Sequence, residues 1–286
     1  MRVVDSHLHL WRLPISTQDS PYAWITPALG PLHRDVTAEE AEGELDAAGV
    51  GAAVLVQADD TVADTESMLQ VCDRHDWAAA TVGWVPLDTP EQASRLLDRW
   101  QQHRAFRGVR HLVHDDPRAD FLELPTVRRS LQAVSDRGLT LDVPDAFPAH
   151  LWQVVGIARD LPDLVVVLDH LGKPPLASGV KSTGFAAWAA QLRALAAEPC
   201  AVAKVSGLRI PGARYDVATL TPALDIALEA FGADRLMYGG DWPMTLPAGG
   251  YGPTLEVLQE WAAPLSPSEQ SAIWHGTAER VYRLPS

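Results

Sequence analysis

Eight short apolar runs, rich in β-branched residues, recur along the chain and are separated by longer segments of mixed character. Each run is apolar at successive positions rather than at alternate ones, which is typical of strands buried on both faces in a parallel sheet. The runs cover residues 3–10, 52–58, 80–87, 106–113, 139–143, 164–170, 200–206 and 235–241.

The segments between the runs carry amphipathic patterns that predict helices. These helices cover residues 37–48, 64–76, 90–104, 125–137, 149–160, 185–197 and 221–231. Strands alternating with helices favour an α/β fold, a distorted (β/α)8 TIM barrel that occupies residues 1–286 as one domain. An open doubly wound sheet is the alternative. It needs a glycine-rich phosphate loop after the first strand, and the sequence has none there.

Two stretches fall outside this alternation. Residues 11–35 form a long, proline-rich connection, and loops of that length in a compact domain are usually lids or rims of a functional site. Residues 254–282 are expected to form one or two helices that close the fold.

Charge and composition argue against several classes of binding partner. Asp plus Glu number 37 against 23 Lys plus Arg, a net charge of −14, and without a local basic patch such a protein repels nucleic acid. The two cysteines, Cys72 and Cys200, give neither a disulfide framework nor a cysteine zinc motif. No apolar stretch reaches the roughly 18 residues that span a bilayer, so we expect no membrane partner.

The first residues of the chain bear on whether the protein is secreted. Asp5, His7 and His9 stand where a secretory signal needs its apolar core, so we expect no signal peptide and a cytoplasmic protein. The sequence leaves the oligomeric state open, a homodimer included.

Polar residues gather at the carboxyl ends of the apolar runs, which form the catalytic face of a (β/α)8 barrel. His7 and His9 end the first run two residues apart, so both imidazoles are expected on the same side of the strand, toward the barrel axis. His170 ends the sixth run and Asp241 the eighth. Three imidazoles and a carboxylate are ligands that zinc accepts, so the pattern predicts one Zn²⁺ bound by these four residues.

Further polar and aromatic residues stand at or just past the other strand ends. Aromatic faces beside hydrogen-bonding groups suit a small polyhydroxylated ring, which predicts a substrate-binding wall. The alternative is that the tryptophans only fill the mouth of the barrel. The predicted wall consists of Trp11, Gln57, Trp84, Arg110, His111, Lys204 and Trp242.

Seven motifs occur in an order that is similar to one family. They are DSHLHLW (5–11), VLVQA (54–58), VGWVPL (82–87), FRGVRH (106–111), DHLGKP (169–174), KVSGL (204–208) and YGGDWP (238–243). This set resembles the lactonase branch of the amidohydrolase superfamily, which includes sugar-acid lactonases and a pyrone-dicarboxylate lactonase. The resemblance implies a (β/α)8 barrel that hydrolyses a small lactone at its strand ends.

Two departures from the superfamily pattern stand out. The fourth strand offers Arg110 and His111 where many members place a bridging lysine or carboxylate, so a two-metal centre is not expected. Gly240 replaces the serine that often precedes the aspartate of the eighth strand.

Lactone hydrolysis needs a base for water, stabilisation of the oxyanion and a proton for the leaving ring oxygen. We expect Asp241 to be the base, with His170 as its catalytic partner. A Zn²⁺ ion would acidify the attacking water and polarise the carbonyl. Alternatively, the imidazoles and Arg110 stabilise the oxyanion by hydrogen bonds and no metal takes part.

Two other activities share this residue set. A decarboxylase of the same superfamily would keep the histidines and the aspartate. A pyrone-dicarboxylate lactonase would need several cations for its carboxylates, and the strand ends offer mainly Arg110, Lys204 and Lys173. That shortage favours a neutral sugar-acid lactone as the small-molecule substrate. A non-catalytic barrel is a further alternative, because fold alone never fixes function.

Overall fold

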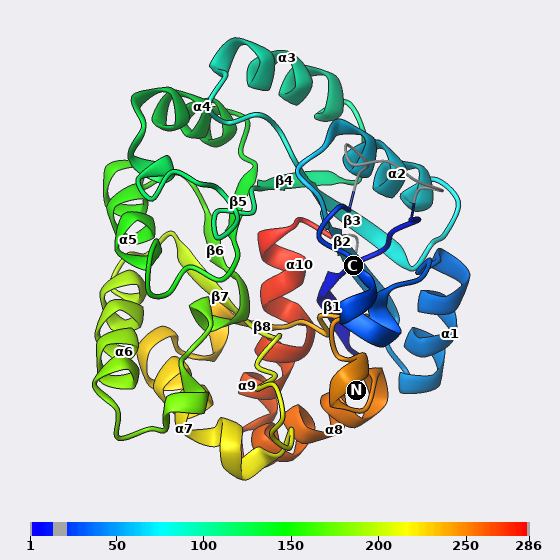
Figure 1. Cartoon of the computed structure of the whole chain (residues 1–286), viewed down its shortest axis with the longest axis vertical. Helices are drawn as coiled ribbons and strands as arrows, with labels where there is room; N and C mark the ends of the chain where they lie inside the picture. Colours follow the sequence, from blue (N-terminus) through cyan, green and yellow to red (C-terminus); the bar gives the residue numbers. More distant parts are fainter. Residues whose placement is uncertain (1, 14–21, 285–286) are drawn as a thin grey trace.

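Eight parallel strands form one sheet in which each strand pairs with the next along the chain (Figure 1). This computed structural model describes residues 2–13 and 22–284. The strands are β1 Val4–Leu8, β2 Ala52–Val56, β3 Ala78–Gly83, β4 Phe106–Arg110, β5 Thr140–Val143, β6 Val166–Leu168, β7 Ala201–Val205 and β8 Leu236–Tyr238. Each overlaps one predicted run, so the barrel predicted from the sequence is confirmed.

The barrel closes just beyond β8 rather than along it. Leu8 and Trp242 form an isolated parallel bridge, and the Trp242 carbonyl accepts a hydrogen bond from the amide of His9 at 2.9 Å. The Asp241 amide donates to the carbonyl of His7 at 2.7 Å. These bonds draw the chain after β8 against the end of β1, where His7, His9 and Asp241 lie.

Helices cover the outside of the barrel between successive strands (Figure 1). They are α1 Ala38–Ala48, α2 Val62–Cys72, α3 Pro90–Trp100, α4 Pro125–Asp136, α5 Leu151–Asp160, α6 Thr183–Ala196, α7 Val217–Phe231 and α8 Tyr251–Ala262. The predicted closing segment forms α9 (Pro267–Ser271), one π-helical turn (Ala272–Gly276) and α10 (Thr277–Val281). In the described part of the chain, every helix is too short or too polar to cross a membrane.

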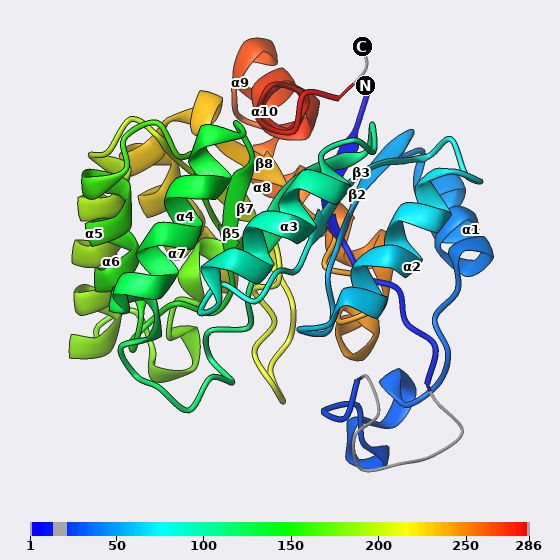
Figure 2. The ribbon, with the colours of Figure 1, turned by 90° about the horizontal axis from the view of Figure 1, so that it is seen from above.

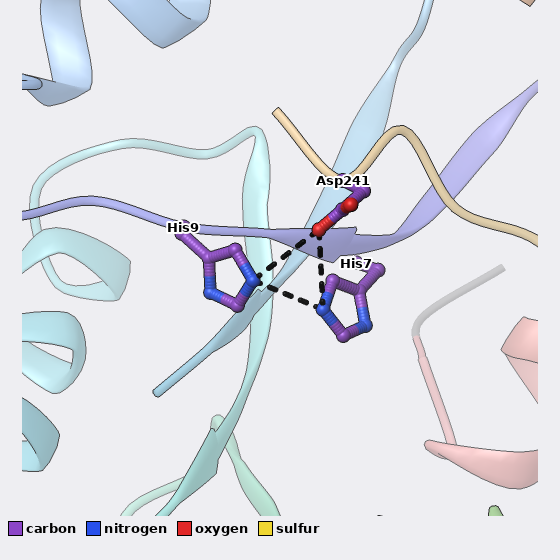
Figure 3. A group of neighbouring side chains, drawn as sticks. All are labelled: His7, His9 and Asp241. Atoms are coloured by element: carbon purple, nitrogen blue, oxygen red, sulfur yellow. Dashed lines mark hydrogen bonds and ion pairs between the residues drawn. The ribbon is translucent and has the colours of Figure 1, made fainter. Parts of the chain in front are cut away.

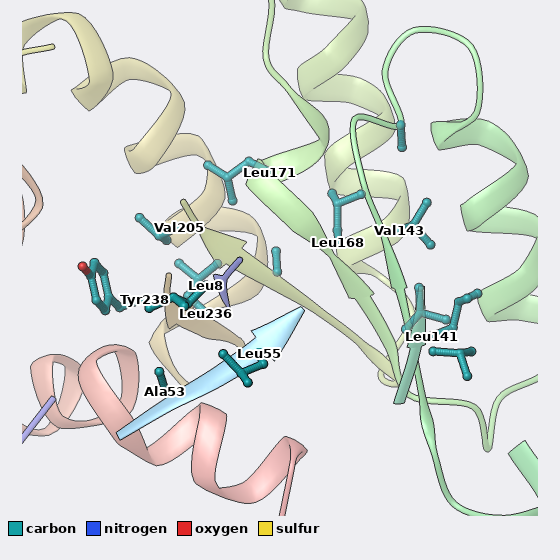
Figure 4. Close-up of a cluster of buried hydrophobic side chains, with 14 of the residues drawn as sticks. Leu8, Ala53, Leu55, Leu141, Val143, Leu168, Leu171, Val205, Leu236 and Tyr238 are labelled. Carbon is teal, nitrogen blue, oxygen red and sulfur yellow. The ribbon is translucent and has the colours of Figure 1, made fainter. Parts of the chain in front are cut away.

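Two clusters of buried apolar side chains pack against the strands of the barrel. The larger one lies between the strands and the outer helices, and Figure 4 shows part of it, with Leu55, Leu141 and Leu168 among the labelled side chains. A second cluster contains Val54, Val167 and Val202 and packs on Ala278 and Tyr282 at the closing end of the chain. The barrel interior is therefore apolar near the closing helices, and its polar residues lie farther along the strands.

The two ends of the barrel are built differently. In Figure 2 the closing helices α9 and α10 lie at one end, and the loop that carries residues 22–35 lies at the opposite end. That loop belongs to the predicted rim of residues 11–35, of which residues 14–21 lie outside the described part of the chain. Tyr22 and Trp24 anchor it to the region after β2 by hydrogen bonds to Asp64 at 2.5 Å and to the carbonyl of Ala58 at 2.8 Å.

Candidate active site

His7, His9 and Asp241 face one another at the junction of β1 with the chain that follows β8 (Figure 3). The Nε2 atoms of His7 and His9 are 3.0 Å apart. The Asp241 Oδ1 atom lies 3.8 Å from the Nε2 of His7 and 3.6 Å from that of His9. All three side chains are buried.

His170 completes this group from the turn after β6. Its Nε2 atom lies 3.8 Å from the Asp241 Oδ1, and its Nδ1 atom is 2.9 Å from the hydroxyl of Ser206. Its ring centroid is 4.6 Å from that of His7. The structure thus brings together all four predicted metal ligands, while the role of His170 as a ligand stays a prediction.

The backbone is bent to aim these side chains inward. His170 has φ of 55° and Asp241 has φ of 49°, in the left-handed region that costs a non-glycine residue free energy and is often found at functional sites. Gly207, after β7, also has φ of 58°, and a Cβ atom there would lie 2.3 Å from the Nδ1 of His170. A glycine at 207 is therefore needed for His170 to lie where it does.

Gly240, the departure from the family pattern, has an equally local explanation. A Cβ atom at this position would lie 2.4 Å from the Oδ2 of Asp5 and 2.5 Å from the ring of Tyr251. Those two groups are hydrogen-bonded to each other at 2.8 Å, and Asp5 also accepts from the amides of His7 and Gly240. The buried Asp5 carboxylate therefore ties β1 to the chain after β8, and no side chain fits at 240.

Burial controls the ionisation of the group. Desolvation lowers the pKa of His7 and of His9, and it lowers the pKa of His170 to about 4, so the imidazoles are neutral near pH 7. Burial by itself would raise the pKa of Asp241, but the neighbouring His170 and His9 outweigh it, and the net pKa is lowered. The site therefore holds an ionised carboxylate among neutral imidazoles.

This donor set fits a divalent cation. The His9 Nδ1 lies 2.8 Å from the Val56 carbonyl, an acceptor, so its Nε2 presents a lone pair toward His7 and Asp241. Asp241 adds an anionic oxygen, and imidazole nitrogen with carboxylate oxygen is a ligand combination used for zinc. The guanidinium of Arg110 lies 3.3 Å from the Nε2 of His7, and its charge disfavours a second metal ion beside the first.

A cavity of about 170 Å³ opens beside these residues. Its wall includes His9, His170, Asp241 and Arg110 from the predicted site. The other lining residues are Trp24, Ala58, Leu112, His114, Asp115, Pro144, Asp145, Lys173, Gly207, Arg209 and Met244.

Three predicted wall residues lie elsewhere in the described structure. Trp11 is buried, with its indole N–H on the carbonyl of Arg34 and its ring against Trp24, which itself lines the cavity. Trp242 is fully buried, and its backbone closes the barrel. The Gln57 carbonyl accepts from Arg110 at 2.7 Å, while its amide nitrogen donates to Asp60 at 3.0 Å.

The other three form bonds within the protein. The Trp84 indole donates to the Nδ1 of His111 at 3.1 Å, and the His111 ring stacks on Phe121 with centroids 4.2 Å apart. Lys204 is fully buried and makes an ion pair with Asp142 at 2.6 Å. Direct contact of these six predicted residues with a substrate stays a prediction, since the cavity wall drawn from the described residues does not include them.

The cavity also has polar residues that sequence reasoning missed. His114, Asp145 and Arg209 come from the loops after β4, β5 and β7, two or more residues past the strand ends. The available signal was weak: each stands in a loop that follows a strand at the catalytic end of a barrel.

Comparison with known proteins agrees with this architecture. The model of the amidohydrolase family matches residues 4–284. A curated protein of Burkholderia multivorans named L-fucono-1,5-lactonase is 36% identical, with 99% of this chain and 96% of that protein covered. One of the same name from Burkholderia ambifaria is 31% identical, with 98% and 95% covered.

A solved structure is similar to this chain over its whole length. It is an amidohydrolase from Burkholderia multivorans with bound zinc, similar at a TM-score of 0.89 and 34% identity, with both chains fully covered. Together with the His7, His9 and Asp241 group, this suggests a divalent metal in this chain.

Proposed function

Because this chain belongs to the amidohydrolase family, we propose that it hydrolyses the ring ester of a sugar-acid lactone. The observation that carries the proposal is the ionised Asp241 carboxylate, held among three neutral imidazoles beside a cavity of about 170 Å³. This cavity is smaller than the roughly 300–1,000 Å³ of drug-sized ligand pockets, which suits one small ring. The two curated relatives named L-fucono-1,5-lactonase support a lactone.

The protein groups divide the work of hydrolysis. Asp241 accepts a proton from the attacking water. His170 lies beside it, with its Nε2 3.8 Å from the Asp241 Oδ1. The Arg110 guanidinium, in the cavity wall, stabilises the oxyanion that forms at the lactone carbonyl. The proton then passes to the ring oxygen as the ester bond breaks, which yields the open hydroxy acid.

Zinc is the metal we propose for this site. His7, His9 and Asp241 would hold it, with His170 as the proposed fourth ligand, and the zinc bound in the similar amidohydrolase structure supports the choice of metal. When bound, a divalent zinc ion supplies Lewis acidity at the carbonyl and acidifies water. The hydrogen-bonded mechanism without metal is the alternative, and removal of metal by a chelator separates the two.

The charges around the cavity favour a neutral substrate. Of its three lining cations, Arg110 bonds Asp169 and the Gln57 carbonyl. Lys173 bonds the Gly207 carbonyl at 2.9 Å and faces Asp145 at 3.7 Å. Only Arg209 is without a protein partner among the described residues, so the cavity offers fewer free cations than a pyrone dicarboxylate needs.

The test is a panel of lactones assayed by proton release. Sugar-acid lactones should be hydrolysed at least about 10²-fold faster in kcat/KM than simple aliphatic lactones of the same ring size, a difference of roughly 2.7 kcal/mol. The reason is that a site built to bond hydroxyls leaves buried polar groups unpaired when they are missing. Equal rates on both classes would remove the sugar-acid assignment.

Two controls run beside this panel. Carbon dioxide release from aromatic acids, without lactone hydrolysis, would establish the decarboxylase instead. Dialysis against a chelator should abolish lactone hydrolysis, and zinc should restore it. Full activity in the chelated protein would leave the hydrogen-bonded mechanism.

A further inference from the structure

A second pocket, of about 280 Å³, lies at the end of the barrel opposite to the proposed active site. Its wall comes from the start of β4, from the turn that leads into β5 and from the chain just after α10, whereas the catalytic face of a barrel is formed by the strand ends. In Figure 2, α10 lies at the end of the barrel away from the loop of residues 22–35. We call this the arginine pocket, and its lining residues are Gln101, Phe106, Arg107, Arg137, Leu139 and Arg283.

Three guanidinium groups line this pocket, and two of them have no carboxylate partner in the described part of the chain. Arg137 makes an ion pair with Asp98 at 2.6 Å. Arg107 and Arg283 donate to backbone carbonyls instead, at 3.2 Å and 2.8 Å. The arginine pocket therefore carries two positive charges that the described residues do not compensate.

The guanidinium of Arg107 is incompletely satisfied by the protein. Its Nε atom is buried and has no acceptor among the described residues. Burial and the neighbouring charge of Arg283 both lower the pKa of Arg107, which shows that the protein disfavours the two cations side by side. An anion bound beside both arginines would relieve that repulsion and accept their unused N–H groups.

The shape and chemistry of the pocket favour a phosphate group attached to a small organic body. A guanidinium presents paired N–H donors that match two phosphate oxygens at once, and a phosphate monoester carries a charge of about −1.5 to −2 near pH 7. The buried side chains of Phe106 and Leu139 add an apolar surface to the wall. The volume of about 280 Å³ is close to the roughly 300 Å³ at which small-molecule pockets begin, so it holds more than a phosphate ion.

The acidic character of the whole protein does not exclude such a ligand. The net charge is −14, but at physiological ionic strength charges more than about 8 Å away are largely screened, so the nearby arginines dominate. A long polyanion such as nucleic acid would extend over the acidic surface outside the pocket, which disfavours it. A small phosphate ester stays within reach of the arginines.

We propose that the arginine pocket binds the phosphate group of a small organic phosphate, with Arg107 and Arg283 as the groups that hold it and with Phe106 and Leu139 against the organic part. The bound molecule ties the start of β4 to the chain after α10, so it stabilises the folded protein. This site is separate from the proposed active site and depends neither on the lactone nor on a metal.

The test is calorimetric titration of the chelator-treated protein with phenyl phosphate in 0.15 M sodium chloride. We expect one saturable site with a Kd below about 1 mM, and no saturable binding of phenol, which lacks the phosphate. Inorganic phosphate should bind about tenfold more weakly, because it leaves the apolar surface of the pocket uncovered. Equal or tighter binding of inorganic phosphate would overturn the assignment of an organic ligand.

Three single variants locate the site. Arg107→Gln and Arg283→Gln should each weaken phenyl phosphate binding at least about tenfold, the order of one charge-assisted hydrogen bond. Arg104→Gln is the matched control, since it changes the net charge equally at an exposed position shortly before β4 but outside the wall of the pocket. Its affinity should stay within about twofold of the wild type.

Two results would contradict the proposal. One is the absence of saturable binding, or an unchanged affinity in both Arg107→Gln and Arg283→Gln. The other is a loss of binding in Arg209→Gln in their place, because the anion would then occupy the catalytic cavity. Should Arg107→Gln not fold, Arg283→Gln decides. None of these readouts uses lactone hydrolysis, so failure of the proposed function is seen separately.

Discussion

At the scale of single residues, Asp241 is the centre of the proposed chemistry, because among the described residues it is the carboxylate that faces all three imidazoles, at 3.6–3.8 Å. Asp241→Asn keeps the shape of the side chain but removes the base. We expect kcat on the best lactone to fall at least about 10²-fold, the low end for lost general-base catalysis, with the fold retained by circular dichroism.

Asp145 offers a matched control for that variant. It lines the same cavity but lies in the loop after β5, near Lys173. Asp145→Asn should change kcat less than about threefold, since surface ion pairs contribute little. Comparable losses in both variants would mean that any charge change in the cavity impairs catalysis, and Asp241 would lose its special role.

Arg209 is the residue we expect to recognise substrate hydroxyls. Its guanidinium lines the cavity and, within the part of the chain that the structure describes, has no protein acceptor. Arg209→Met should raise KM for sugar-acid lactones about tenfold and leave kcat/KM for simple aliphatic lactones within about twofold, because only the hydroxylated ring loses a partner. Equal losses on both lactone classes would assign Arg209 a general role instead.

These residues also show how far sequence reasoning reaches into a site. His7, His9, His170 and Asp241 were predictable because the strands of a barrel all end at one face, so strand-end residues converge. Arg209 was not, because the path of a loop decides whether its side chain reaches the cavity.

The predicted aromatic wall shows that a position at a strand end does not by itself bring a side chain into the cavity wall. Trp11 and Trp242 are both buried, Trp11 with its ring against Trp24, and of these three tryptophans Trp24 is the one in the cavity wall drawn from the described residues. Lys204 is likewise at a strand end, yet the buried carboxylates Asp142 and Asp169 hold it inside. The partner that a side chain binds depends on contacts between distant segments, and those contacts cannot be read from a single sequence.

At the scale of elements, the strands were predictable because both of their faces are buried, and the deviations have local causes. The third run was expected to continue to residue 87, but β3 ends at Gly83. The amide of Trp84 donates to the hydroxyl of Thr65 at 2.8 Å instead of joining a ladder, and Pro86 has no amide hydrogen to offer. An apolar run thus indicates which residues are buried, but the strand pairing can end before the run does.

The loop after β7 provides a prediction at this scale. Gly207 and Gly212 both lie in this loop with positive φ, at 58° and 76°. Alanine at either position costs about 1–2 kcal/mol of backbone strain. Only at 207 does the new Cβ meet the His170 ring, whereas nothing lies within 4 Å of it at 212.

Gly207→Ala should therefore lower kcat by at least about tenfold, because His170 must move from Asp241. Gly212→Ala should lose similar stability and keep its activity. Thermal unfolding and steady-state kinetics of the pair separate strain from displacement. An active Gly207→Ala protein would show that the position of His170 is not critical.

At the scale of the whole molecule, burial of single carboxylates links the stability of the fold to pH. Asp64, near the start of α2, is buried and accepts hydrogen bonds from the hydroxyl of Tyr22 and the amide of Ala58. Burial nevertheless raises its pKa from 3.8 to about 7. In the unfolded chain Asp64 gives up its proton at lower pH, so its contribution to stability is complete below about pH 4 and is lost as the pH rises toward 7.

Asp64→Asn removes this dependence, because the amide does not titrate and its oxygen still accepts from Tyr22. Between pH 5 and pH 8 the free energy of unfolding of the wild type should fall relative to the variant by about 3 kcal/mol, the value of two pKa units at 1.36 kcal/mol each. Urea unfolding of both proteins in chelating buffer measures this difference without a contribution from bound metal. Parallel pH profiles for the two proteins would mean that Asp64 is already ionised in the fold, stabilised by Tyr22 and Ala58 against the cost of burial.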